Sequence, residues 1–340
     1  MGARRGFVTG GSWCVDTNKT VSFWPAEDGI TEYLGEERGG GGSGCNLALD
    51  IRRLDPGMPV ETIGLVGDDE PGRYLLAVAK DAGVDRRQMQ VTRDAGTQLT
   101  DAFVSEKSRR RVHIFSRGAA SLLTPDHFDF TESSARFLHL GLPGVHARMD
   151  AGWAGEANGW VSVLKKAKAA GLRTNLELCS LEAGLLARLA RPCFAHLDTI
   201  IINDNEIAAL SGIATIKDGV TDAAACERAA RNVLENGAMD MVAVHWPAMA
   251  LAVTRDGQAL RLPSVAVPPG DALSANGAGD AFASGMLYGL HEGWSLHEAL
   301  TLAHAAAAAS LRSLTTTGAV ESWQACLALA QNWGWRATKA

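Results

Sequence analysis

Residues 276–290 read NGAGDAFASGMLYGL, a glycine-rich turn followed by an apolar run with helical spacing. Glycines that open a helix leave backbone N–H groups pointing at one spot, and the helix dipole adds positive potential there. Such a site suits a phosphate, or the charge that develops during phosphoryl transfer. Asp280 falls in the first helical turn. It is either an acid that complements the dipole or a carboxylate that accepts a proton from an attacking hydroxyl.

Strand-like and helix-like segments alternate over most of the 340 residues. Pro71 in a first turn, Asp222 at a cap position and Gly83 as a stop mark helix ends. This alternation predicts an α/β fold with a mostly parallel sheet and helices on both faces. The expected strands cover 7–9, 60–66, 137–140, 199–202, 241–244 and 251–254, and the expected helices cover 46–54, 71–82, 159–170, 222–237, 279–290, 296–311 and 321–333.

Two regions interrupt the alternation. Residues 15–38 contain short strand-like pieces, and residues 97–117 read as a hairpin with a polar turn at 107–110. We expect one α/β domain over residues 1–340, with a small discontinuous β element formed by about 15–40 and 97–117. The turn carries Arg109, Arg110 and Arg111. Most such runs are solvated turns; the alternative is a cluster that binds an acidic or phosphorylated substrate.

A second glycine-rich segment, 39–44, reads GGGGSG and also precedes a helix. Gly39, Gly41 and Gly44 match the G-x-G-x-x-G spacing of dinucleotide-binding turns, but no buried strand leads into them. The other interpretations are a flexible turn and a close backbone approach to a polar ligand. The chain contains no G-x-x-x-x-G-K-[ST] sequence, which excludes a P-loop ATPase.

Composition narrows the class of protein. Lys and Arg number 32 and Asp and Glu 38, giving a net charge of −6, so the chain lacks the basic field of a nucleic-acid binder. No stretch approaches the roughly 20 apolar residues that span a bilayer. The six cysteines are scattered and contain no C-x-x-C pair, which predicts reduced thiols and a cytoplasmic location.

Several motifs, taken together and in order, resemble the ribokinase-like (PfkB) carbohydrate kinases. NGAGD at 276–280 is similar to that family's C-terminal signature, and GGSGCNLA at 41–48 is similar to its N-terminal signature. The other matching segments are Asp16 after the first strand, GLVGDDEPG at 64–72, RGA at 117–119, NDNE at 203–206 and TTGA at 316–319. The resemblance implies a ribokinase-like three-layer sandwich with a small β lid. It also implies Mg²⁺- and ATP-dependent phosphorylation of a hydroxyl on a sugar or nucleoside-like substrate.

The resemblance assigns roles to particular residues. Asp280 would be the base, ionised at neutral pH with an ordinary pKa of about 3.9. The backbone of Gly277, Ala278 and Gly279 would form an anion hole. Asp16 and Glu206 also have simpler interpretations, as a turn residue and as a first-turn helix acid. The implied substrate contacts are Asp16, Gly41, Gly42, Asn46 and Arg117; Asn203 and Glu206 would hold Mg²⁺ through water; and His245, Asn276, Thr317 and Gly318 would border the nucleotide.

The sequence departs from the family pattern in three places. Ser274 and Ala275 replace the usual Asp-Thr, which leaves the monovalent-cation site of some members uncertain. The stretch 245–250 lacks the usual Thr-x-Gly-x-x-Gly, and Pro247 removes a backbone donor there. The strand near Arg173 ends in Asn-Leu-Glu at 175–177 instead of Asp-x-Asn.

Three functions therefore compete. The first is a small-molecule kinase acting on a sugar, sugar acid or sugar phosphate, with a nucleoside as the alternative substrate. The second is a ligand-binding protein on a kinase scaffold, favoured by the altered nucleotide segments. The third is a nicotinamide-dependent oxidoreductase based on 39–44. A homodimer that pairs through the lid is a further expectation drawn from the family.

Overall fold

A sheet of nine strands forms the centre of the computed structural model, which describes residues 4–108 and 110–337. From β13 to β5 all neighbouring strands are parallel, whereas β14 and β15 extend the sheet in antiparallel fashion. The predicted α/β class with a mostly parallel sheet is therefore confirmed. In spatial order the strands are β15 (Ala259–Pro263), β14 (Met249–Thr254), β13 (Met241–Trp246), β10 (Thr199–Asn203), β9 (Arg173–Leu176), β8 (Phe137–Gly141), β1 (Phe7–Gly11), β4 (Val60–Gly67) and β5 (Asp85–Thr92).

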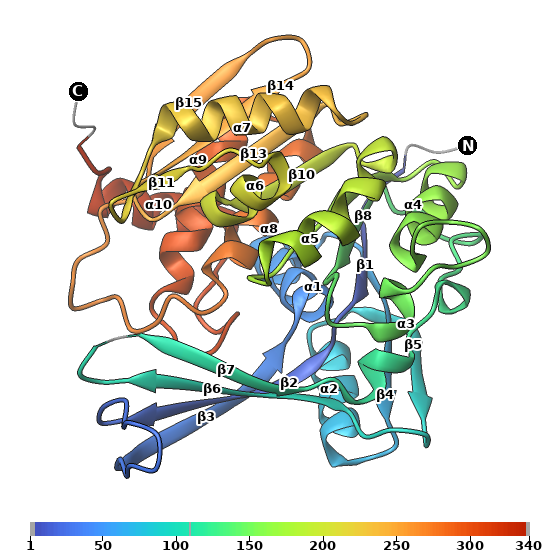
Figure 1. Ribbon diagram of the computed structural model, residues 1–340, viewed down its shortest axis with the longest axis horizontal. Helices are drawn as coiled ribbons and strands as arrows, with labels where there is room; N and C mark the ends of the chain where they lie inside the picture. The colour runs from blue at the N-terminus through green and yellow to red at the C-terminus, as the bar shows by residue number, and fades with distance from the viewer. Residues whose placement is uncertain (1–3, 109, 338–340) are drawn as a thin grey trace.

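Helices cover both faces of this sheet and create two separate cores (Figure 1). In β10, Ile201 packs into the first core, and its neighbours Ile200 and Ile202 pack into the second, as the strand pleat requires. The first core contains α1 (Ser43–Leu54), α2 (Glu70–Asp81), α8 (Ala278–Glu292), α9 (Leu296–Ser310) and α10 (Trp323–Trp333). The second contains α3 (Ala147–Asp150), α4 (Gly159–Ala169), α5 (Ala183–Ala190), α6 (Asp204–Ser211) and α7 (Ala223–Glu235).

The predicted helices all occur, with ends within a few residues of those expected. Asp222 caps α7 by accepting hydrogen bonds from Ala224 and Ala225, at 2.8 and 3.0 Å. The sequence did not predict β5, β15 or α5. Strands β5 and β15 lie at the two edges of the sheet and bury almost none of their residues fully, so they lack the apolar pattern of the central strands.

A second sheet of four strands occupies the two regions that interrupt the alternation. Its order is β3 (Tyr33–Gly41), β2 (Cys14–Val21), β6 (Gln98–Ser105) and β7 (Arg111–Ser116). Residues 15–38 thus form two long antiparallel strands, not the short pieces expected. Figure 1 shows this small sheet as a separate layer along the bottom of the view. The remaining short pair is β11 (Ile216–Lys217) with β12 (Val220–Thr221).

The glycine segment 39–44 straddles β3 and the start of α1. Gly39 to Gly41 pair with β2 in an antiparallel ladder, whereas a dinucleotide-binding turn follows a parallel strand. The oxidoreductase interpretation is therefore wrong. Gly42 is the N-cap of α1 with φ 87°, and a Cβ at this position would lie 2.7 Å from the Ser12 carbonyl oxygen. Only glycine fits this close backbone approach.

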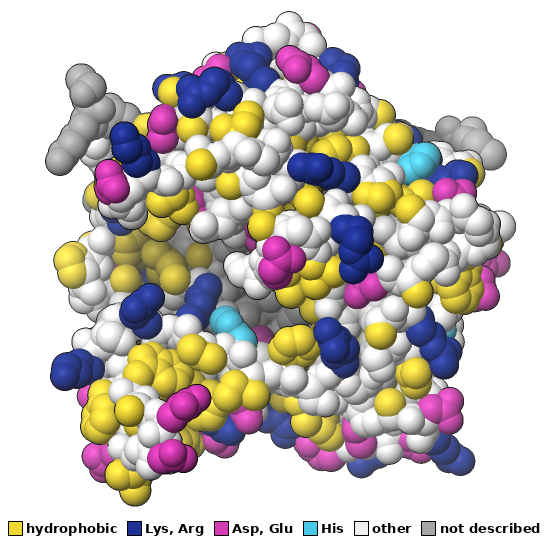
Figure 2. All heavy atoms as spheres, viewed as in Figure 1, with side chains coloured by type: hydrophobic (Ala, Val, Ile, Leu, Met, Phe, Trp, Pro, Cys, Tyr) yellow, Lys and Arg dark blue, Asp and Glu magenta, His cyan; other side chains and the backbone are white. Residues whose placement is uncertain are grey.

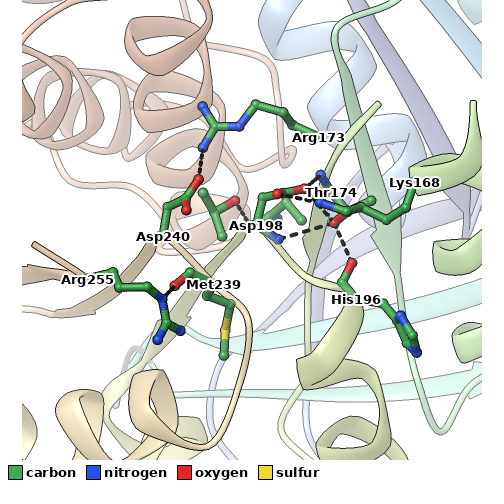
Figure 3. A network of polar contacts seen from close by, with 10 residues as sticks. Lys168, Arg173, Thr174, His196, Asp198, Met239, Asp240 and Arg255 are labelled. Atoms are coloured by element: carbon green, nitrogen blue, oxygen red, sulfur yellow. Dashed lines mark hydrogen bonds and ion pairs between the residues drawn. The ribbon is translucent and has the colours of Figure 1, made fainter. Parts of the chain in front are cut away.

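Polar contacts tie together the amino ends of three central strands (Figure 3). Asp198, just before β10, accepts hydrogen bonds from Lys168 Nζ at 2.6 Å and from the Thr174 backbone N–H at 2.8 Å. Asp240, just before β13, pairs with Arg173 at 2.9 Å. These contacts join the amino ends of β9, β10 and β13, opposite the carboxyl ends that meet the cavity described below.

The six cysteines are all unpaired thiols, five of them buried and Cys179 half-buried, as the sequence predicted. Over residues 4–108 and 110–337, no helix is long and apolar enough to cross a membrane.

Candidate active site

A cavity of about 900 Å³ lies where the carboxyl ends of the central strands meet the small sheet. Figure 2 shows the hollow on the molecular surface, with basic and histidine side chains along its lower rim. Ligands of parallel α/β sheets bind at this edge. Of the sequence-predicted site residues, the cavity brings together Asp16, Gly42, Asn46, Asn203, Glu206, His245, Asn276, Gly277, Ala278, Gly279 and Asp280.

Four predicted residues do not line the cavity: Gly41, Arg117, Thr317 and Gly318. Arg117 lies beyond the end of β7, where its guanidinium donates to the Gly144 carbonyl at 3.2 Å. The 316–319 segment reaches the cavity through Thr316 instead.

The amino end of α8 forms the floor of the cavity. Gly277 caps this helix in the left-handed conformation, with φ 76°, and a Cβ there would lie 2.2 Å from the Thr316 carbonyl oxygen. The first N–H groups of an α-helix have no intrahelical acceptors. Ala278 N–H makes only a long 3.4 Å contact to the Ala275 carbonyl. This end of α8 therefore presents N–H donors and positive dipole potential to the cavity.

Asp280 lies in the first turn of α8 and lines the cavity. Its carboxyl is within hydrogen-bonding reach of Asn46 on α1 and of Glu177. Burial raises the pKa of Asp280 well above its usual range, and the neighbouring Glu177 raises it further. The expectation of an ordinary pKa for Asp280 is therefore wrong, because the sequence could not show these surroundings.

Glu177 is a site residue that the sequence analysis recorded only as a departure from the family pattern. It follows β9 and lines the cavity beside Asp280. Its Oε2 lies 2.6 Å from His139 Nε2, and His139 is fully buried in β8. Burial raises the pKa of Glu177 to about 7. The only signal in the sequence was its position at the carboxyl end of a strand.

Asp16 enters the cavity from β2 of the small sheet, close enough to Asp280 for the two charges to interact. It is buried, and its Oδ1 accepts a hydrogen bond from Cys14 Sγ at 3.1 Å. Burial raises its pKa to about 6. Gly41 leaves the space that Asp16 fills, because a Cβ on Gly41 would lie 2.0 Å from Asp16 Oδ2. Gly41 thus supports the site without lining it.

Asn203 and Glu206 form the capping box of α6. Asn203 Oδ1 accepts from the Glu206 backbone N–H at 2.9 Å, and Glu206 Oε2 accepts from the Asn203 N–H at 3.0 Å. The helix-cap interpretation of Glu206 therefore holds, yet both side chains also line the cavity. Burial raises the pKa of Glu206 to about 7, so a cation beside it would be needed to keep it ionised below neutral pH.

The far side of the cavity is aromatic. The ring centroids of His245 and Phe282 lie 4.8 Å apart, and those of Phe282 and His304 lie 5.3 Å apart. Burial lowers the pKa of His245 to about 4, so its ring is neutral. Pro247 lines the cavity at the turn between β13 and β14. This wall offers stacking surface with few charges.

The small sheet adds basic groups that face inward. Arg111 and His113, two residues apart on β7, line the cavity together. His113 is within hydrogen-bonding reach of Asn276, whose Nδ2 also donates to Asn18 Oδ1 on β2 at 2.9 Å. Of the charge run, Arg109 lies outside the described residues, whereas Arg111 acts electrostatically on Asp280. The interpretation of the run as a purely solvated turn is therefore incomplete.

Among the described residues, no group of three or more His, Cys, Asp or Glu side chains is arranged to hold a metal ion directly. Mg²⁺ usually keeps several waters and takes one or two carboxylates plus substrate phosphates. The oxygen donors of Asn203 and Glu206 fit that mode of binding.

Comparison with known proteins places this geometry in context. The family described as "pfkB family carbohydrate kinase" matches residues 12–323. A 5-dehydro-2-deoxygluconokinase of Shouchella clausii is 27% identical over 310 residues, covering 87% of this chain and 86% of the relative. A second, from Clostridium perfringens, is 26% identical over 309 residues, covering 88% and 84%.

Solved structures show the same fold. The ribokinase of Giardia lamblia superposes with a TM-score of 0.79 at 19% identity, covering 98% of this chain and 100% of that one. Arabidopsis thaliana ribokinase, complexed with ribose and ATP, gives a TM-score of 0.76 at 18% identity, covering 96% and 99%. The predicted ribokinase-like fold is thereby confirmed.

Proposed function

Because the chain belongs to the PfkB family of carbohydrate kinases, we propose that it phosphorylates a hydroxyl of a small sugar or sugar-like substrate, using ATP and Mg²⁺. The observation that carries this proposal is the content of one cavity. Asp280 stands at the amino end of α8, with Asp16 and Asn46 beside it and Asn203 with Glu206 nearby. Acceptor, anion-binding and cation-binding groups thus converge on one place, as phosphoryl transfer requires.

Asp280 accepts the proton of the attacking hydroxyl. The high pKa that burial and Glu177 impose makes it a stronger base than an exposed aspartate, once positive charge in the site keeps it ionised. Asn46 lies beside this carboxyl and partly offsets the rise in its pKa. The N–H groups of Gly277, Ala278 and Gly279 stabilise negative charge on the oxygens of the phosphoryl group during its transfer. Loss of one such donor raises the activation free energy by about 3 kcal/mol.

The substrate hydroxyls bind at the Asp16 end of the cavity. Asp16, Gly42 and Asn46 all line it, and Asn46 is held in turn by the Thr316 hydroxyl, 2.8 Å from its Oδ1. The small sheet acts as a lid over this end, linked to the α8 turn through Asn18 and Asn276. Arg111 adds a positive charge near Asp280, where negative charge accumulates.

Asn203 and Glu206 would hold Mg²⁺, in part through water. Bound there, Mg²⁺ would neutralise phosphate charge. The nucleotide would occupy the aromatic side, next to His245 and Asn276. Ser274 and Ala275 give no support to a monovalent-cation site. Thr317 and Gly318 do not line the cavity themselves, but they directly follow Thr316, which does.

The outer parts of the small sheet support the expected homodimer. Ile30, in the loop between β2 and β3, and Tyr33 and Ile114, on the sheet itself, are 89%, 54% and 62% exposed. A second copy of the chain, paired through its lid, would cover them. Sedimentation equilibrium tests this: the dimer mass is expected, and a monomer at all concentrations would remove the dimer from the account.

ATP consumption by the purified protein with Mg²⁺ tests the kinase proposal. The panel holds neutral sugars, sugar acids, sugar phosphates and nucleosides, and includes 5-dehydro-2-deoxygluconate, the compound named in the relatives. Turnover with one compound identifies the substrate class. If a compound raises the melting temperature but no compound is phosphorylated, the protein is a ligand-binding member of the family. The altered turn at Pro247 would then be the place of lost nucleotide contacts.

A further inference from the structure

Two carboxyl groups meet at the reacting end of the cavity. Asp280, from the first turn of α8, and Glu177, from the end of β9, lie within hydrogen-bonding reach of each other. Ionised carboxylates only accept hydrogen bonds, so such a contact needs one shared proton. We propose that Glu177 is a positioning residue for Asp280, sharing one proton with it so that the pair acts as a single base, and that His139 holds Glu177 in place.

The inference rests on the proposed kinase function and adds residues that the family resemblance does not supply. At this point of the chain the family pattern has Asp-x-Asn, whereas this sequence has Asn175 and Glu177. The family's residues therefore cannot be transferred to this position, and the contacts must decide the role.

A chain of hydrogen bonds, in which each residue donates to the next, leads from Thr199 to Glu177. Thr199 Oγ1 donates to Asn175 Oδ1 at 3.1 Å, which leaves the Asn175 Nδ2 group to donate to His139 Nδ1 at 3.0 Å. His139 therefore carries its proton on Nε2 and donates it to Glu177 Oε2, 2.6 Å away. All three supporting residues are fully buried.

The tautomer of His139 is assigned from the orientation of the Asn175 amide in this network. Burial lowers the pKa of His139 to about 4, so it remains a neutral donor across the working pH range. Since Oε2 accepts from His139, we assign the contact with Asp280 to Oε1 of Glu177.

Other charged groups surround the Asp280–Glu177 pair and affect its protonation. Glu206 and Asp50 act on Glu177, and Arg111 acts on Asp280 from the lid. Asp16 lies near enough to feel Asp280. Apart from Arg111, these neighbours are acids, which favours the singly charged form of the pair over the doubly ionised form.

The proton balance of the step is simple. Before transfer the pair holds one proton and a net charge of −1. The substrate O–H bond breaks as the hydroxyl oxygen bonds to phosphorus, and its proton moves to Asp280. The pair then holds two protons and is neutral. One proton returns to solvent after the product leaves. No oxidant or further reactant is needed.

The test is the pH dependence of kcat and kcat/KM in Glu177→Gln and Glu177→Ala. Glutamine keeps both contacts, since its oxygen accepts from His139 and its NH₂ group donates to Asp280, but it cannot ionise. We expect wild-type activity to fall at high pH, because loss of the shared proton breaks the contact that positions Asp280. This transition should disappear in Glu177→Gln. Glu177→Ala should lower kcat by about tenfold or more while KM for the sugar stays within about threefold.

His146→Gln is the matched control, because His146 is also fully buried, with its pKa lowered to about 4, but makes its contact to the Ala120 carbonyl. Its pH profile should equal that of the wild type. His139→Gln, in contrast, should lower kcat in the same way as Glu177→Ala.

Two results would overturn the inference: superimposable pH profiles for wild type and Glu177→Gln, or undiminished kcat in Glu177→Ala. If the Glu177 variants fail to fold, a ¹³C-carboxyl NMR titration of the wild-type protein decides. Asp280 should titrate in two coupled steps, and a single step would contradict the pairing. Failure of the proposed kinase function can be distinguished from failure of this inference, because it would appear as retained turnover in Asp280→Asn.

Discussion

Gly41→Ala should damage substrate binding without placing any new group in the cavity. Gly41 is the last residue of β3 and pairs with Cys14 in β2. An added Cβ would lie 2.0 Å from Oδ2, 2.3 Å from Cγ and 2.6 Å from Oδ1 of Asp16. Carbon atoms and their neighbours rarely approach within about 3.4 Å, so the Asp16 carboxylate must move by about 1 Å or more.

A displacement of about 1 Å in a positioning group commonly costs about 100-fold in rate, or about 3 kcal/mol. We therefore expect Gly41→Ala to lower kcat/KM for the sugar by about 100-fold, mostly through KM, because Asp16 contacts the ground-state substrate as well as the transition state. The KM for ATP should change little. Steady-state kinetics with each substrate varied in turn measures both effects.

Gly39→Ala is the matched control. Gly39 lies on the same face of the same strand, but its added Cβ would meet only the Thr315 side chain, 3.2 Å from Cγ2. Thermal unfolding of both variants checks that the fold is intact. If Gly41→Ala keeps kcat/KM within about threefold of Gly39→Ala, Asp16 does not contact the substrate and the reasoning is refuted.

Three further predictions concern the lid, the α8 turn and the acid near β2. Arg111→Ala should lower kcat by about 100-fold in steady-state assays, whereas Arg110→Ala, exposed at the same hairpin, should leave it unchanged; equal effects would remove Arg111 from the site. Gly277→Ala should lower the melting temperature and abolish turnover, because its φ of 76° and the 2.2 Å contact to Thr316 O exclude a side chain; a variant as stable and active as wild type would contradict this. Asp16→Asn should bind sugar more weakly yet unfold at higher urea concentration at pH 8. The folded-state pKa of Asp16 is raised from 3.8 to about 6, so its ionisation costs the folded protein about 3 kcal/mol as pH rises from about 4 to above 6. At pH 4 the two proteins should be equally stable, and equal stability at both pH values would show that Asp16 is not desolvated.

Much of the fold was predictable because local signals agreed with the final structure. The segment after Asp222 and the NGAGD turn carry caps and apolar spacing that remain valid in the folded protein. Edge strand β5 was missed because its mostly polar DRRQMQVT sequence buries only Met89, which is too little to create a pattern.

The site was predictable where a motif lies at one element, and not where distant elements meet. Asp280, Asn46 and Asp16 were expected from motifs, and the cavity contains them. Glu177 gains its partner from His139, 38 residues away in the chain, and this proximity exists only after β8 and β9 pair. The raised pKa of Asp280 has the same origin, since burial is a tertiary property.

Asp280→Asn, measured at saturating ATP, Mg²⁺ and sugar, tests the central claim most directly. Asparagine keeps the size of the side chain but cannot accept the proton. The account predicts a loss of kcat of at least about 100-fold, with sugar affinity by calorimetry within about threefold of the wild type. Asp271→Asn, an exposed acid before the same turn, is the control and should behave as wild type. A variant that retains more than about a tenth of the wild-type kcat would contradict the assignment of Asp280 as the base.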